Sequence, residues 1–187
     1  MSPLKIGLVT LLAGGISIGS AIFGQRWLGG HPMIDRLAEH GDSLAQTLPD
    51  FRLPDAAGRE MTSSAWAGKI LVLHFWATWC PDCLQELPAF VRTQESQQSA
   101  GVQVVAIAVD RAADVADFLQ TNAVNFPVLI ADTGTISMAK RLGNRVMAVP
   151  FTVVFDRRGR CTSRHLGVLT EADLAEAIAP LVAPPRL

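Results

Sequence analysis

The pattern of apolar and polar positions divides the chain of 187 residues into short alternating segments after residue 48. Continuous apolar runs of strand length predict buried strands at 70–76, 102–110, 126–132 and 151–156. Helical periodicity predicts helices at 81–97, at 112–122, at 134–144 and from Thr170 to just before Pro180. Strands that alternate with helices favour a parallel core sheet, so the predicted fold class is α/β.

Two further segments predict hairpins. Residues 49–69 contain the turn sequence DAAG between short extended pieces, and DRRG joins the strand at 151–156 to another at 160–167. The second hairpin adds antiparallel strands to the edge of the sheet.

The first 30 residues differ from the rest of the chain. After Lys5, residues 6–25 carry no charge, and at about 1.5 Å per residue they span roughly the hydrocarbon core of a bilayer. This length favours an uncleaved membrane anchor within 1–30. A cleaved secretory signal, with Gly19 and Ala21 before the cut, is the alternative.

The remaining chain divides at two points. Residues 31–48 are predicted to form a linker or short helix, followed by one domain at 49–183 and a tail at 184–187. A hydrophobic content of 49% is ample for a core, and 16 basic against 17 acidic residues leave no basic surface for nucleic acid. Nucleic acid is therefore excluded as a partner.

The segment WCPDC places Cys80 and Cys83 directly after an apolar strand. A structural staple is disfavoured because so short a loop gains little from closure. A closed zinc site needs four ligands, but Cys161 is isolated and no histidines show ligand spacing. A copper site formed by the pair and one histidine remains an alternative to a redox couple.

Redox chemistry needs only this pair. Cys80 lies where a buried strand passes into a helix, and the positive end of the helix dipole stabilises a thiolate there. Cys83 follows one turn later and is expected to point inward. We therefore predict that Cys80 is the attacking nucleophile and that Cys83 resolves the mixed disulfide.

Glu86 lies on the apolar face of the same helix, because Cys83, Glu86, Leu87 and Phe90 follow at helical spacing. Partial burial should raise the pKa of its carboxyl and suit it to exchange a proton with Cys83. A glutamate at the rim of the core is the alternative.

The stretch VLHFWATWCPDCLQELP resembles the active-site segment of the membrane-anchored thioredoxin-like thiol–disulfide oxidoreductases of the TlpA, ResA and CcmG (DsbE) group. The resemblance continues through VVAIAVD, VPFTVVFDRRGR and RHLG and covers about residues 48–182. It implies a thioredoxin-like fold, with a mixed central sheet flanked by helices, an N-terminal hairpin and a strand–helix insertion at about 112–131. It also implies that Glu86 is the active-site acid.

By the same resemblance, Pro150 matches the cis-proline that faces the disulfide. A proline there leaves the backbone groups of Val149 free to pair with a substrate strand. Trp79 is assigned to the rim of the site, and Pro81 and Asp82 between the cysteines complete the expected substrate contacts. Asp82 should oppose a thiolate at Cys80.

Five other residues receive structural assignments. His74 departs from the family pattern; it could relay protons, but an inward histidine bonded to a backbone carbonyl is the favoured interpretation. Trp76 is assigned to the core, Pro88 to a helix kink, and Cys161 and His165 to an edge strand.

We therefore expect a monomeric, cofactor-free reductant of protein disulfides, anchored in the bacterial cytoplasmic membrane with its domain facing the periplasm or the cell exterior. The resemblance implies apocytochrome c or copper-site proteins as clients and a transmembrane electron donor of the CcdA or DsbD kind. A disulfide oxidase or isomerase of the same fold, and a copper- or haem-handling chaperone, are the alternatives.

Overall fold

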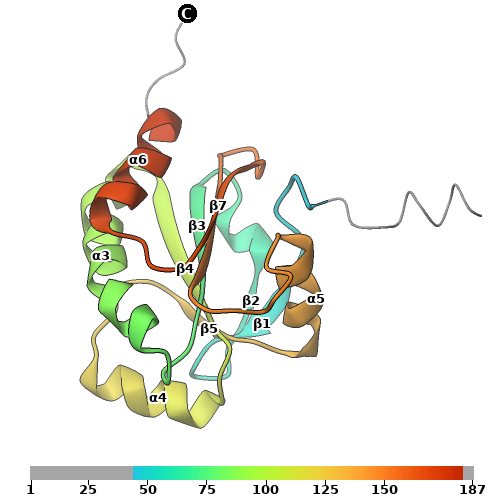
Figure 1. Ribbon diagram of the computed structural model, residues 1–187, viewed down its shortest axis with the longest axis vertical. Coiled ribbons are helices and arrows are strands. Elements are labelled where there is room, and N and C mark those ends of the chain that lie inside the picture. Colours follow the sequence, from blue (N-terminus) through green and yellow to red (C-terminus); the bar gives the residue numbers. More distant parts are fainter. Residues whose placement is uncertain (1–43, 183–187) are drawn as a thin grey trace, which may run out of the picture. The chain divides into compact units, whose positions relative to one another are not determined.

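Figure 1 shows the protein as a computed structural model, which describes residues 44–182. The predicted anchor, most of the predicted linker and the predicted tail lie outside the described residues. Within 44–182, every helix is too short or too polar to cross a membrane.

The core is a five-stranded sheet with the order β5-β4-β3-β6-β7. Its strands are β3 (Ile70–Trp76), β4 (Val102–Ala108), β5 (Val128–Ile130), β6 (Phe151–Phe155) and β7 (Cys161–Leu166). The first three are parallel, whereas β6 runs antiparallel to β3 and β7 antiparallel to β6. All seven residues of the central strand β3 are buried, as its continuous apolar run predicts.

Helices pack on one face of the sheet, and a hairpin and a helix pack on the other (Figure 1). On one face lie α3 (Pro81–Gln97), α4 (Ala112–Thr121) and α6 (Glu171–Val182). On the other face lie the hairpin of β1 (Arg52–Pro54) and β2 (Glu60–Thr62) and helix α5 (Thr133–Arg141). Two short 3-10 helices, Ser63–Trp66 and Gln98–Ala100, complete the fold.

Alternation along β3 places His74 on the α3 side of the sheet. Val72 and Trp76 pack in the cluster under α3, α4 and α6, whereas Leu73 and Phe75 pack under the hairpin and α5. Since side chains alternate between faces, His74 points toward α3, where its ring stacks on Phe90 with 4.2 Å between centroids.

The predicted mixed sheet and hairpin extension are confirmed. The insertion predicted at about 112–131 is present, with its helix α4 before its strand β5. One predicted helix end is corrected. Helix α6 does not end before Pro180 but continues to Val182. Proline there removes a single N–H near the end of the helix, and Leu181 and Val182 still pack against the core. In the described part of the segment predicted as a linker or short helix, residues 44–48 form no helix, and Thr47 forms a bridge to Arg160.

Candidate active site

Cys80 caps the N-terminus of α3. Its backbone is extended, with φ −96° and ψ 105°, and its Sγ accepts the N–H of Cys83 at 3.1 Å. Pro81 occupies the start of the helix, where a missing N–H costs nothing. The sulfur therefore lies at the positive end of the helix dipole, as the sequence predicts.

Cys80 and Cys83 form a disulfide with 5.3 Å between their Cα atoms. Cys80 retains 5% exposure, whereas Cys83 is completely buried at 0%. Of the two cysteines, only Cys80 therefore keeps any contact with solvent. This difference favours Cys80 as the attacking residue.

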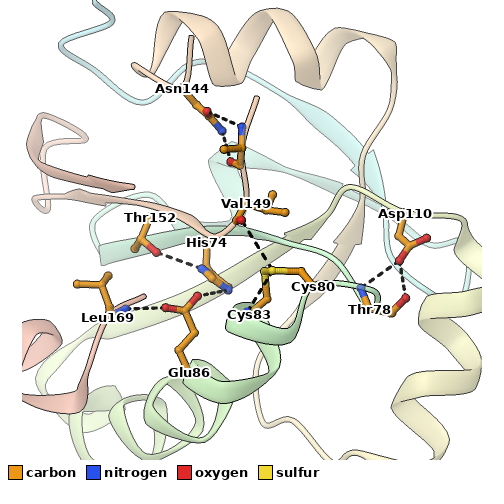
Figure 2. Close-up of a disulfide and its surroundings, with 11 residues drawn as sticks. His74, Thr78, Cys80, Cys83, Glu86, Asp110, Asn144, Val149, Thr152 and Leu169 are labelled. Carbon is orange, nitrogen blue, oxygen red and sulfur yellow. Dashed lines mark hydrogen bonds and ion pairs between the residues drawn. A yellow bond between two sulfur atoms is a disulfide. The ribbon is translucent and has the colours of Figure 1, made fainter. Parts of the chain in front are cut away.

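The predicted cis-proline faces this disulfide. The Val149–Pro150 peptide bond is cis, and the carbonyl oxygen of Val149 lies 3.8 Å from the Sγ of Cys80. Within the described residues the N–H of Val149 has no hydrogen-bond partner. The backbone edge of Val149 is thus available beside the reactive sulfur (Figure 2).

The loop before the cis-proline is held by a buried amide. Asn144 Nδ2 donates to the carbonyl of Ala148 at 2.7 Å, and the N–H of Ala148 donates to Asn144 Oδ1 at 3.1 Å. Met147, between them, has a left-handed φ of 54°, which a residue with a side chain rarely adopts. Sequence reasoning missed this pair of hydrogen bonds, although asparagine is among the residues that favour turns.

A second pair of hydrogen bonds, also missed from the sequence, holds the loop before Cys80. The N–H and hydroxyl of Thr78 both donate to Asp110 Oδ2, at 3.0 and 2.5 Å. Burial acts to raise the pKa of Asp110, but the bonds from Thr78, the backbone N–H of Arg111 and the charge of Arg111 outweigh it and lower the pKa. Asp110 follows the end of β4, which is the only sequence signal for this role.

Behind the disulfide, Glu86 occupies the buried face of α3 (Figure 2). Its Oε2 accepts the N–H of Leu169 at 2.7 Å, and its Oε1 lies 3.5 Å from His74 Nε2. His74 Nδ1 lies 3.1 Å from Thr152 Oγ1. The expected bond from His74 to a backbone carbonyl is therefore wrong: the register of β3 with β6 places Thr152 opposite the ring instead.

The pKa values of the two buried groups move in opposite directions. Burial raises the pKa of Glu86 to about 7; the N–H of Leu169 opposes this rise and the charge of Asp82 adds to it. Burial lowers the pKa of His74 to about 3. At neutral pH, His74 is therefore uncharged and Glu86 is close to its midpoint, where a proton is exchanged most readily. The raised pKa predicted for Glu86 is confirmed.

The other predicted residues occupy the positions expected of them. Trp79 is 65% exposed immediately before Cys80, and Pro81 and Asp82 are exposed at the start of α3. Trp76 is buried in the core, and Cys161 is a free, half-buried thiol on the edge strand β7. The kink at Pro88 stays a prediction.

Within residues 44–182, no cluster of three or more histidine, cysteine or acidic side chains is placed to hold a metal ion.

A cysteine pair that opens a helix, faces a cis-proline and lies over a mixed sheet defines a thioredoxin-like protein. The sequence model of the Redoxin family matches residues 43–178, and the chain belongs to this family.

Named relatives refine this assignment. The thioredoxin-like protein YneN of Bacillus subtilis is 29% identical over 171 residues, covering 82% of this chain and 97% of YneN. The thiol-disulfide oxidoreductase ResA of the same organism is 28% identical over 166 residues, covering 88% and 83%. A crystal structure described as thiol:disulfide interchange protein DsbE of Chlorobium tepidum superimposes with a TM-score of 0.67 at 29% identity, covering 75% and 100%. The chain is a thiol–disulfide oxidoreductase of the TlpA, ResA and CcmG group.

Proposed function

We propose that the protein is a membrane-tethered, extracytoplasmic reductant of protein disulfides that serves cytochrome c maturation or the assembly of a respiratory copper site. The observation that carries this proposal is the arrangement around the cysteine pair. Cys80 keeps a small exposure, Cys83 is completely buried, and a buried acid near its midpoint lies on the same helix face as Cys83.

The first half of the reaction takes place at Cys80. Its thiolate attacks one sulfur of the client disulfide, and the bond between the two client sulfurs breaks. The departing client thiolate takes up a proton, and the client remains attached to Cys80 as a mixed disulfide. The N–H and carbonyl of Val149, beside the Sγ of Cys80, pair with the extended client segment during this step.

The second half releases the client. The thiol of Cys83 gives its proton to the carboxylate of Glu86, three residues further along α3 and so on the same face. The Cys83 thiolate attacks the Sγ of Cys80, and the second client sulfur leaves as a thiolate and is protonated. The client gains two electrons and two protons, and the Cys80–Cys83 pair is oxidised to the disulfide seen in the structure.

Several features support a reducing direction and the location. The carboxylate of Asp82 in the first turn of α3 opposes a thiolate at Cys80, which works against an oxidising couple. The uncharged run at 6–25 is long enough for a tether. A reductant outside the cytoplasm must be recharged, so the proposal includes a transmembrane dithiol donor of the CcdA or DsbD kind.

Trapping of clients tests the proposal. Full-length Cys83→Ser cannot release the mixed disulfide, so it should accumulate covalent complexes with proteins that carry haem-binding or copper-binding cysteine pairs. Full-length Cys80→Ser, the matched control, should give none. Recovery of clients from Cys80→Ser would reverse the two roles, and recovery of clients without such cysteine pairs from Cys83→Ser would contradict the proposed pathway.

A further inference from the structure

Two buried polar atoms face each other behind the disulfide. Oε1 of Glu86 and Nε2 of His74 lie 3.5 Å apart, and within the described residues neither has a hydrogen-bond partner. Both side chains are almost completely excluded from solvent, with exposures of 2% and 0%. Buried polar atoms without a partner are rare in folded proteins, so this pair calls for a physical explanation.

The hydroxyl of Thr152 determines which nitrogen of His74 carries the proton. Thr152 is buried, and within the described residues its hydroxyl has one partner, Nδ1 of His74 at 3.1 Å. If Nδ1 carried the hydrogen, the hydroxyl proton of Thr152 would have no acceptor. If the hydroxyl donates to Nδ1, both groups are satisfied and the hydrogen of the neutral ring is on Nε2. Nε2 lies on the side of the ring that faces Glu86 (Figure 2).

Glu86 therefore lies between two N–H donors from distant parts of the chain. The N–H of Leu169, after β7, donates to Oε2 at 2.7 Å. The N–H of His74, on β3, faces Oε1 from slightly beyond hydrogen-bond distance in this disulfide form. Both donors favour the ionised carboxyl, because a carboxylate accepts hydrogen bonds more strongly than a carboxylic acid does.

We propose that His74 is a positioning residue for the resolving step: fixed by Thr152 in the Nε2–H tautomer, it donates to Glu86 and keeps this buried carboxyl available as the proton acceptor for Cys83. No change of tautomer is needed during the reaction. The carboxyl of Glu86 takes up the proton from Cys83, and the hydrogen on Nε2 of His74 stays in place. The inference rests on the proposed function, because it takes Glu86 as the base for Cys83.

Other charged groups near the pair do not replace this donor. On α3, Asp82 is negative and disfavours the carboxylate of Glu86. On β7, His165 lies opposite Thr152 in the register but is exposed, and its Nε2 lies 3.2 Å from the carbonyl of Val168. On α6, Asp173 interacts with His165 and Thr170. The remaining neighbours of His74 on the sheet and on α3, Ala106 and Phe90, are apolar.

The resolving step can be measured separately from the attack by Cys80. Reduced full-length protein, with Cys161→Ser as background, is mixed with the chromogenic disulfide dithiobis-nitrobenzoate. The first thiolate released reports attack by Cys80, and the second reports attack by Cys83 on the mixed disulfide. The rate of the second phase is recorded against pH, and its midpoint reports the pKa of the Glu86 carboxyl in the mixed disulfide.

His74→Leu should move the midpoint of the second phase upward by about one to two pH units, the worth of a hydrogen bond to a charged group. The pH profile of the first phase should not move. His74→Gln keeps an N–H donor at the end of the side chain, so its midpoint should lie close to the wild-type value. Thr152→Val should move it part of the way upward, because the tautomer is no longer fixed. Val154→Ala, an equally buried change on β6, controls for lost packing and should not move it.

Two results would overturn the inference: an unchanged second phase in His74→Leu, or equal shifts in His74→Leu and His74→Gln. If His74→Leu folds poorly, the infrared band of the protonated Glu86 carboxyl, identified with Glu86→Gln, gives the same pKa from His74→Gln and Thr152→Val. Failure of the proposed function would look different, because it is read from the clients that Cys83→Ser traps and not from the pH profile of the second phase.

Discussion

Replacing Glu86 by glutamine should change how stability depends on pH. Burial raises the pKa of this carboxyl from 4.5 to about 7. Because the folded pKa lies above the unfolded one, the folded state holds more protons between these values, and the free energy of unfolding falls as the pH rises through this window. At about 1.36 kcal/mol per pKa unit, the step from 4.5 to about 7 corresponds to a loss of about 3 kcal/mol.

Glutamine removes this loss because it does not ionise. His74 contributes a term of the opposite sign, since its pKa is lowered from 6.5 to about 3 and stability falls as the pH drops through that range. This term is present in both proteins and cancels in the comparison. The stability of Glu86→Gln minus that of wild type should therefore rise by about 3 kcal/mol from about pH 4 to about pH 8.

Denaturant unfolding of the oxidised full-length proteins at a series of pH values measures this difference. Each pair of curves should have the same slope against denaturant, so that the midpoints report stability. Asp173→Asn, which replaces an exposed carboxyl on α6, is the matched control and should show no such rise around neutral pH. A difference between Glu86→Gln and wild type that stays constant with pH would refute the argument that Glu86 is buried with a raised pKa.

Two further predictions concern the redox couple and the N-terminus. Asp82→His should raise the reduction potential of the Cys80–Cys83 couple, because a cation in the first turn of α3 favours the Cys80 thiolate; an unchanged potential would contradict this electrostatic argument. Residues 6–25 should keep the protein in the membrane fraction after an alkaline wash, with the domain accessible to protease from outside. A soluble mature product that begins near Ile22 would show a cleaved signal instead.

The parts of the site that lie within one continuous stretch of sequence are predicted well. The continuous apolar run at 70–76 and the helix at 81–97 agree with β3 and α3 residue by residue. The position of Glu86 on the buried face also follows from helical spacing within α3 alone. These features depend on neighbours in the sequence, which periodicity detects directly.

The contacts that tune the site come from distant residues, and no local pattern encodes them. Thr152 reaches His74 only through the register of β6 against β3, and Leu169 reaches Glu86 across 83 positions of sequence. The hydrogen-bond partner of His74 was therefore predicted wrongly, although its inward orientation was right. The end of α6 was also misplaced, because packing of the residues after Pro180 outweighs the local preference of proline.

The reduction potential of the Cys80–Cys83 couple tests the central claim most directly, because it separates a reductant from an oxidase of the same fold. It is measured by equilibrating the full-length protein with glutathione or dithiothreitol mixtures and quantifying the two free thiols. The helix dipole at Cys80 favours the thiolate, whereas the negative charge of Asp82 opposes it. We predict a reducing couple at roughly −200 to −270 mV, and a value near about −120 mV would contradict the proposed direction of electron flow.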